Sequence, residues 1–250
     1  MAYAWMPGAR RIRARADGGQ LQGGAPRVVW LTLGVDPRAI SVTSAAQRLI
    51  DEGRPCHLVW NPLTGEIAQL LPIVSAGRML GTREHLSYDP HTPHPMPSVN
   101  REGRLCVQIG VLGLAKEPFT GYPIINHNDI TEWLDSWHIP RRWPAGQPAP
   151  YRQTERPRSR ALWALGGHYG ASQVPETSSI GPGCIDIEQL TGSPESLTLN
   201  RARSTRPAAA IALGQLNGRQ TVLEATAAVP LTAARVLHRE PDVPRRAGRA

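Results

Sequence analysis

The stretch RVVWLTLGV, residues 27–35, is the first compact run of apolar and β-branched residues in the chain. Nearly continuous apolar runs of this length are typical of strands that are buried on both faces of a sheet. A second run of this kind, GRLCVQIGVLG, occupies residues 103–113. We predict that both runs form buried strands and that ordered structure begins at the first.

A helix and a hairpin are expected between these strands. SVTSAAQRLIDEG, residues 41–53, carries an apolar helical face over residues 45–50, with Ser44 as the expected N-cap and Gly53 at the end. CHLVWNPLTGEIAQLLP, residues 56–72, has two strand-like runs around a turn that contains Asn, Pro and Gly, which predicts a hairpin.

A second helix is expected after the second strand. DITEWLDSWHIP, residues 129–140, is typical of a capped amphipathic helix that a proline ends. The expected order is therefore strand, helix, hairpin, strand, helix. This order predicts an α/β fold with a mixed central β-sheet flanked by helices.

Composition divides the chain into three parts. Residues 1–26, rich in Gly and Arg, predict an N-terminal arm that packs on the domain, and residues 27–190 hold the α/β domain itself. Residues 191–250 form a basic C-terminal extension, which we expect to be partly disordered. Within the domain, residues 88–97 predict a loop, and residues 166–183 predict an irregular loop that closes the domain.

Arginine dominates the charge of this 250-residue chain. The formal net charge is +8, and every basic residue except Lys116 is arginine. Because the planar guanidinium suits bidentate contacts to carboxylates and phosphates, anionic partners are favoured. The alternative is that the arginines are merely solvated. Nucleic acid is not the expected partner, since the chain has 7 Trp but no recognisable nucleic-acid-binding module.

Cysteine spacing and apolar patterning exclude several classes of protein. Cys56, Cys106 and Cys184 form no C-x-x-C pair, so neither a disulfide framework nor a zinc ribbon is indicated. We interpret Cys106 and Cys184 as small buried hydrophobic residues. No apolar run is long enough to span a bilayer, and the first residues lack a secretory signal pattern. We expect synthesis in the cytoplasm, with action at the cell wall, or in a phage particle, only after release.

Several segments together carry a resemblance to a known family. They are RVVWL at residues 27–31, HLVWNPLTGEIAQLLP at 57–72, NREGRLCVQI at 100–109, ITEWLDSWHIPRRWPAG at 130–146, and GGHYGASQVPE at 166–176 followed by PGCID at 182–186. This set resembles the type-2 N-acetylmuramoyl-L-alanine amidases, the peptidoglycan-recognition-protein family, in the version found in actinobacteria and their phages. The resemblance covers roughly residues 5–190 and leaves out the C-terminal extension.

The resemblance implies a zinc enzyme whose catalytic positions have been replaced here. In the family, Zn²⁺ polarises the lactyl amide of muramic acid and activates water, with three protein ligands and one open position. The matching ligand positions in this chain are Leu31, Ala171 and Gly181. Gly110 stands where the family has a general-base Glu, and Ser179 where it has a basic or His residue. We therefore predict no catalytic residues, no metal ligands and no cofactor, where the family would use zinc.

The neighbours of these positions match the family and support the alignment. They are His168, Gly170, Ser172, Gln173, Val174, Pro175, Glu176, Pro182 and Gly183. A substitute metal site would have to come from His57, His168, Cys184 or the loop pair His91 and His94.

The sequence predicts a peptidoglycan-binding protein on an amidase frame, a pseudoenzyme that holds muropeptide without hydrolysing it. The candidate groove residues are His57, Asn61, Arg78, Asn100, Arg101, Gln108, His168, Tyr169 and Gln173. Asn61 and Asn100 have the alternative of being turn residues. Two other functions stay open: an active, endolysin-like cell-wall amidase with a substitute metal site, and a structural or assembly component of a phage particle. In the second case, residues 191–250 would contact a protein partner.

Overall fold

The computed structural model describes residues 2–81, 98–153 and 158–192. The chain divides into two compact units, Met1–Thr205 and Arg206–Ala250, and the second lies wholly outside the described residues. The predicted loop at residues 88–97, the His91 and His94 pair within it, and the extension beyond Gly192 also lie outside them.

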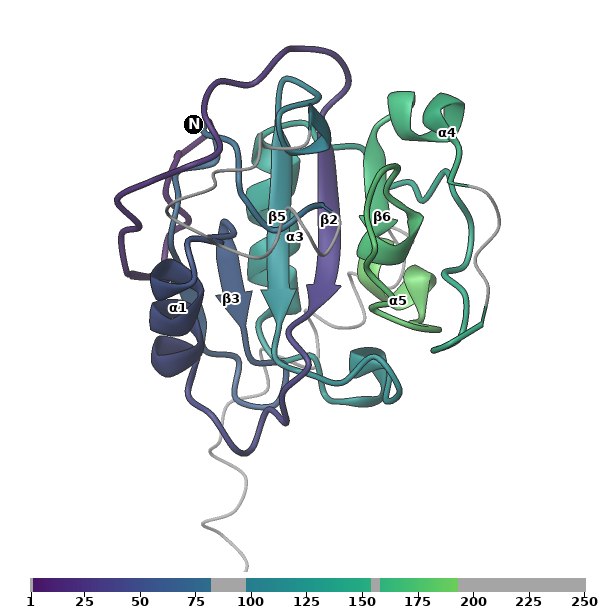
Figure 1. Ribbon diagram of the computed structural model, residues 1–250. Coiled ribbons are helices and arrows are strands. Elements are labelled where there is room, and N and C mark those ends of the chain that lie inside the picture. Colours follow the sequence, from purple (N-terminus) through teal and green to yellow (C-terminus); the bar gives the residue numbers. More distant parts are fainter. Residues whose placement is uncertain (1, 82–97, 154–157, 193–250) are drawn as a thin grey trace, which may run out of the picture. The chain divides into compact units, whose positions relative to one another are not determined.

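A mixed six-stranded sheet forms the centre of this unit (Figure 1). Its strands, in spatial order, are β1 (Arg10–Arg11), β4 (Ile67–Gln69), β3 (Leu58–Trp60), β5 (Cys106–Val111), β2 (Arg27–Thr32) and β6 (Gly167–Gly170). β3 and β4 are antiparallel, and all other neighbouring strands are parallel. The predicted α/β fold with a mixed sheet is confirmed, as are the two buried strands and the hairpin.

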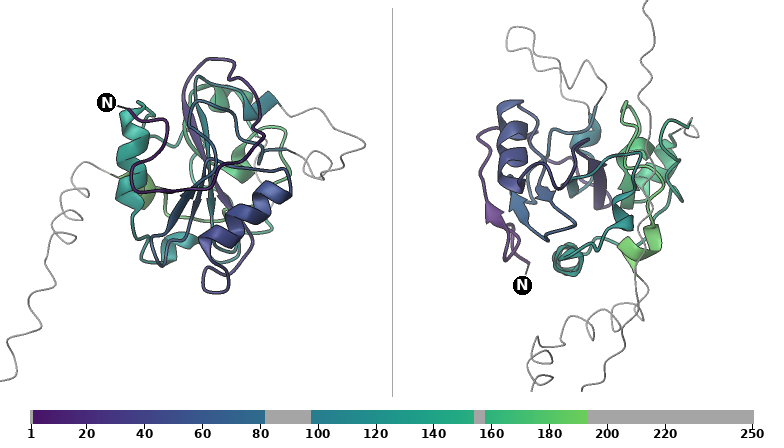
Figure 2. Two further views of the ribbon diagram at one scale, coloured as in Figure 1. Left: turned by 90° about the vertical axis from the view of Figure 1, so that its left-hand side faces the viewer. Right: turned by 90° about the horizontal axis from the view of Figure 1, so that it is seen from below.

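The two faces of the sheet are covered by different helices. α1 (Val42–Asp51) packs on one face and α3 (His127–Ser136) on the other, as the edge-on view in Figure 2 shows. Because side chains alternate along a strand, Val29 of β2 packs with α1 while Trp30 packs with α3. This alternation explains why the central strands are apolar at almost every position.

Helix α1 begins three residues before the position expected from the sequence. Ser41 is the N-cap, and its side chain accepts a hydrogen bond from the Ser44 backbone N–H at 3.1 Å. The prediction of Ser44 as the cap was therefore wrong: Ser41 has the extended backbone that an N-cap requires, and Ser44 lies inside the helix. Gly53 follows the end of α1 with φ +64°, as predicted for a residue that ends a helix.

Helix α3 is displaced towards the N-terminus relative to the prediction. It begins at His127 after Asn126, which has a left-handed backbone and makes no side-chain cap. It ends at Ser136, before Pro140, because Trp137 and His138 leave the helical conformation, His138 with φ +56°. Two short helices, α4 (Arg160–Ala164) and α5 (Ile187–Thr191), complete the described part.

Strand β6 corrects the prediction of an irregular loop over residues 166–183. Arg27 pairs with Gly167, and the register continues to Trp30 opposite Gly170. The GHYG sequence has two glycines and no β-branched residue, so its local propensity for strand is low, and pairing with β2 overrides that propensity. The Tyr169 hydroxyl also helps to hold β6 in place, because it donates a hydrogen bond to the Leu162 carbonyl at 2.6 Å.

The N-terminal arm lies against the sheet and α3, so the prediction that ordered structure begins at Arg27 was wrong. Met6 is buried, β1 pairs with β4, and the indole N–H of Trp133 donates to the Tyr3 carbonyl at 2.8 Å. In the ranges that the structure describes, no helix is long and apolar enough to cross a membrane.

Candidate ligand-binding cleft

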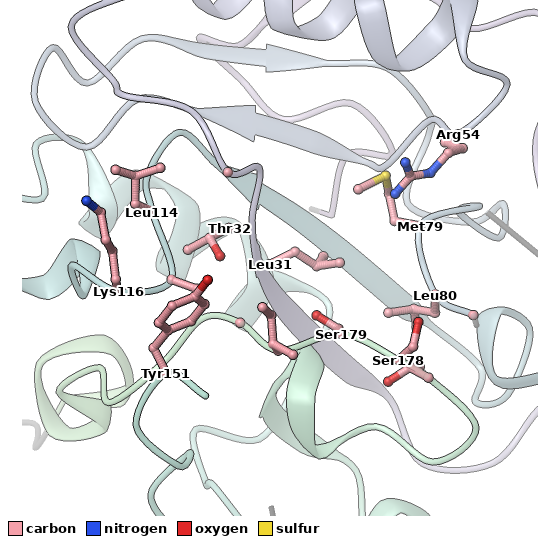
Figure 3. Close-up of a pocket in the computed structure, with 16 residues that line it drawn as sticks. Leu31, Thr32, Arg54, Met79, Leu80, Leu114, Lys116, Tyr151, Ser178 and Ser179 are labelled. Carbon is pink, nitrogen blue, oxygen red and sulfur yellow. The ribbon is translucent and has the colours of Figure 1, made fainter. Parts of the chain in front are cut away.

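A cleft of about 450 Å³ opens where β2 and β5 end (Figure 3). Its walls come from the end of β2, the segment after β5, the segment before residue 82, and the loop at residues 177–181. The lining residues are Leu31, Thr32, Gly34, Arg54, Met79, Leu80, Gly81, Leu114, Ala115, Lys116, Tyr151, Thr177, Ser178, Ser179, Ile180 and Gly181. The carboxyl ends of parallel strands are the usual place for ligand sites in α/β folds.

The positions that the resemblance marks as catalytic gather around this cleft. Leu31, Ser179 and Gly181 line it. Gly110 pairs with Leu31 in the sheet, and Ala171 is fully buried in the 3₁₀ turn that follows β6. The Ser172 N–H donates to the Gly181 carbonyl at 2.7 Å, which joins this turn to the cleft wall. Segments far apart in the sequence thus meet at this cleft.

These residues do not fit a zinc ion. The side chains of Leu31 and Ala171 carry no donor atom, and a Cβ added at Gly181 would lie 2.4 Å from the Thr32 hydroxyl oxygen. A ligand side chain at Gly181 would therefore need Thr32 to move. Within the described ranges, no group of three or more His, Cys, Asp and Glu side chains is placed to hold a metal.

The histidines considered as substitute ligands are bonded inside the protein. His57 accepts from the Gln108 N–H at 3.0 Å through Nδ1, and its Nε2 lies 2.9 Å from the Ser75 carbonyl oxygen. His168 accepts from the Trp30 indole at 3.2 Å through Nδ1, while its buried Nε2 has no hydrogen-bond partner among the described residues. Burial lowers the pKa of His57 to about 4 and that of His168 to about 3, so both are neutral near pH 7.

Cys184 is exposed, so its interpretation as a buried hydrophobic residue was wrong. The next residue, Ile185, is fully buried, and the side chain of Cys184 is left outside the core. Cys106 is buried as expected, and burial raises the pKa of its thiol to about 12.

The charged residues of the cleft are cations. Arg54 and Lys116 line it at opposite ends (Figure 3), and no Asp, Glu or His is among the lining residues that the structure describes. Leu31, Leu80, Leu114 and Ile180 contribute apolar surface, and Ile180 is 56% exposed. The cleft thus offers positive charge and apolar surface, and its described lining residues include no Asp, Glu or His that could act as a general base near pH 7.

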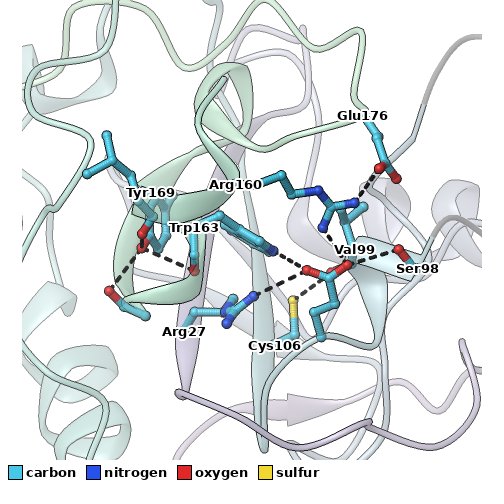
Figure 4. Close-up of polar contacts among 11 residues, drawn as sticks. Arg27, Ser98, Val99, Cys106, Arg160, Trp163, Tyr169 and Glu176 are labelled. Atoms are coloured by element: carbon cyan, nitrogen blue, oxygen red, sulfur yellow. Dashed lines mark hydrogen bonds and ion pairs between the residues drawn. The ribbon is translucent and has the colours of Figure 1, made fainter. Parts of the chain in front are cut away.

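One wall of the cleft is fixed by arginines. Arg158 donates to the Thr177 hydroxyl and to the Ser179 carbonyl, both at 2.9 Å. Arg160 forms an ion pair with Glu176, the residue directly before the loop at residues 177–181 (Figure 4). It forms a second ion pair with Glu102, in which the nitrogen–oxygen distance is 2.7 Å. These contacts hold the loop at residues 177–181 against the sheet.

Glu102 is the centre of this network. It accepts hydrogen bonds from Ser98 at 2.9 Å, Trp163 at 2.6 Å and Arg160 at 2.7 Å, and its carboxylate lies 3.7 Å from Arg27 (Figure 4). Burial by itself would raise the pKa of Glu102, but the hydrogen bonds from Arg160, Ser98 and Trp163 hold it below the ordinary value. Glu102 and Arg160 are 58 residues apart in sequence, so no local pattern could have indicated the pair.

None of the predicted groove residues lines the cleft. Gln108 and Asn100 are fully buried and instead support its wall. The Gln108 side chain accepts from the Met79 N–H at 2.9 Å, and Asn100 accepts from the Leu80 N–H at 3.1 Å and donates to the Leu80 carbonyl at 2.7 Å. The polar groups of these side chains are hydrogen-bonded within the protein, so this structure does not support a direct contact between them and a ligand.

The remaining predicted groove residues serve other parts of the fold. Asn61 is a turn residue, as the alternative proposed: its side chain accepts from the Leu63 N–H at 3.0 Å. Tyr169 and Gln173 are largely buried and border a separate cavity of about 570 Å³. Arg78 and Arg101 are partly exposed and lie outside the cleft.

Comparison with known proteins gives no relative: no family model, no curated protein and no solved structure matches the chain.

Proposed function

We propose that this protein binds muropeptide, a fragment of the bacterial cell wall, in the cleft and does not hydrolyse it. The observation that carries the proposal is the meeting of Leu31, Ser179 and Gly181 in one cleft at the strand ends. The amidases that this sequence resembles carry catalytic groups at those positions, whereas here Leu31 and Gly181 have no polar side-chain atom and Ser179 has only a hydroxyl.

The charge of the cleft supports an acidic ligand. Peptide stems of the cell wall end in carboxylates, and Arg54 and Lys116 give the cleft positive charge at both ends. The apolar lining residues, among them the exposed Ile180, suit the aliphatic part of such a ligand.

Calorimetric titration with a muramoyl tripeptide tests the proposal. Lys116→Ala removes one cation from the cleft, and we expect about a three- to tenfold weaker affinity, as for a partly solvated charge pair. The matched control is Arg104→Ala, because Arg104 is exposed and precedes β5, at the opposite end of the sheet. If the wild-type protein takes up no muropeptide, or if both variants weaken it equally, the proposal is wrong.

Metal content separates this function from the alternative of an active amidase. A substitute zinc site would need ligands beyond the described residues, such as His91 and His94. Under the proposal, protein purified with added Zn²⁺ and dialysed against a weak chelator retains no stoichiometric zinc and releases no stem peptide from cell walls. Stoichiometric zinc together with peptide release would establish the enzyme instead.

A further inference from the structure

A small side pocket adjoins the cleft. Its volume is about 100 Å³, and it shares Thr32, Arg54 and Met79 with the cleft, so these residues stand between the two spaces. Arg54 and Met79 lie beside each other at one end of the cleft (Figure 3). The other lining residues are Leu33, Val35, Ile40, Ala45, Arg48, Leu49 and Glu52.

The charges around this side pocket do not cancel. Glu52 accepts from the Arg48 Nε at 2.7 Å and lies 3.6 Å from an Arg54 guanidinium nitrogen. One carboxylate therefore serves two guanidinium groups, and one positive charge remains without a counter-charge among the lining residues.

Arg54 is the less well compensated of the two cations. Its 3.6 Å distance to Glu52 is longer than a hydrogen bond, and its buried Nε has no hydrogen-bond partner in the part of the chain that the structure describes. Its side chain is 26% exposed, against 61% for Arg48. Desolvation by burial lowers the pKa of Arg54, which means that the charged form is held at a cost in free energy. A bound anion would offset this cost.

We propose that the Arg54 end of the cleft binds a free carboxylate that stands beside a small aliphatic group. The carboxylate would lie against the outer guanidinium nitrogens of Arg54, and the aliphatic group would enter the side pocket between Leu33, Ile40 and Leu49. A volume of about 100 Å³ holds a group of roughly three heavy atoms, at the ~30 Å³ that a water takes in the liquid. The ligand class is therefore a short peptide whose terminal residue has a small aliphatic side chain.

This assignment rests on the proposed function only in its choice of a cell-wall peptide, because the carboxylate site can be probed alone. N-acetyl-L-alanine and N-acetyl-L-alaninamide differ only in the charge and chemistry of their terminal group. We expect nuclear magnetic resonance titration to show at least about tenfold tighter binding of the acid by the wild-type protein, as for a hydrogen-bonded charge pair. Equal binding of acid and amide by the wild-type protein would overturn the inference without any variant.

Two variants locate the site. Arg54→Met keeps the length of the side chain and removes the charge, and it should abolish the preference for the acid; Arg54→Lys should keep a weaker preference, because Lys lacks the bidentate fork. Arg104→Met, at the opposite end of the sheet, should keep the full preference. Retention of the full preference by a folded Arg54→Met protein would overturn the inference. If Arg54→Met does not fold, Arg54→Lys is the test instead, and retention of the full preference by a folded Arg54→Lys protein would overturn the inference.

Titration with a muramoyl pentapeptide, whose terminal residue is alanine, and with its C-terminal amide separates the two proposals. If neither compound binds, the proposed function fails, while the N-acetyl-L-alanine result still decides the carboxylate site. If both bind with equal affinity, the proposed function stands and the assignment of Arg54 is overturned.

Discussion

Glu102→Gln should destabilise the fold more than its position on the surface suggests. The substitution keeps the size of the side chain and removes the charge that faces Arg27 at 3.7 Å and Arg160 at 2.7 Å. The Arg27 side chain is 4% exposed, and Glu102 is its ion-pair partner in the described part of the chain. The variant therefore leaves a buried cation without a counter-charge.

The expected loss follows from the contacts of Glu102. Hydrogen bonds to charged groups contribute about 1.5–3 kcal/mol each, and removing one partner of a fully buried pair costs about 3–5 kcal/mol. Because the Glu102 side chain is 23% exposed and Gln keeps a neutral acceptor, we expect a loss of about 2–4 kcal/mol. In a domain of this size, that lowers the thermal midpoint by roughly 5–10 °C.

Urea unfolding of the wild-type protein and the variant measures this loss. Glu117→Gln is the matched control, because Glu117 is 55% exposed and pairs with Lys116 at 3.5 Å; it should change stability by less than about 0.5 kcal/mol. The difference in the free energy of unfolding between the wild-type protein and Glu102→Gln should also depend on pH. Since the folded-state pKa of Glu102 is below its ordinary value of 4.5, its contribution is complete above that pH and is lost as pH falls through the folded-state pKa. If Glu102→Gln matches the control, the network does not stabilise the fold as argued.

Three further results are expected. Burial lowers the pKa of His168 from 6.5 to about 3, so below pH 6.5 the unfolded chain takes up a proton that the folded protein does not. The free energy of unfolding should therefore fall by about 1 kcal/mol per pH unit because of this residue. In acid titration of His168→Gln, the free energy of unfolding should fall less steeply with pH. Ile180→Ser should weaken muropeptide affinity about tenfold with little change in stability, whereas Val74→Ser, at an equally exposed residue outside the cleft lining, should leave the affinity unchanged in the same calorimetric titration. Gly181→Asp should lower the free energy of unfolding by about 1–3 kcal/mol because of its clash with Thr32, and Gly121→Asp, where no atom lies within 4 Å, should cost less than that in urea unfolding; equal losses in the two would contradict the packing described for Gly181.

Long apolar runs and turn chemistry were sufficient to predict most of the fold. The strands at Arg27 and Cys106, the hairpin and both long helices could be expected because their patterns are local. β6 could not be expected in that way, since the GHYG sequence forms a strand only because the exposed edge of β2 is available to it. The end of α1 could be predicted from Gly53, but its start could not, because both Ser41 and Ser44 are chemically suited to cap a helix.

The residues that line the cleft could not be predicted from the sequence as groove residues. Leu31, Ser179 and Gly181 were singled out by the alignment, and the structure places them together. The polar residues expected to face a ligand, such as Gln108, are instead bonded to the backbone behind the cleft, because a buried amide must satisfy its own hydrogen-bonding groups. Nothing in the sequence singled out Arg54 as a binding residue, because an arginine-rich chain gives no means of separating it from the other arginines until its neighbours in the fold are known.

Binding without cleavage is decided most directly by equilibrium dialysis of the zinc-equilibrated protein against a muramoyl tripeptide, followed by mass spectrometry of the recovered ligand. The proposed function predicts that the protein retains the tripeptide and that the compound is recovered intact, with its lactyl amide unbroken. Failure to retain the tripeptide would contradict muropeptide binding, and recovery of free muramic acid and peptide would show that the protein is an amidase.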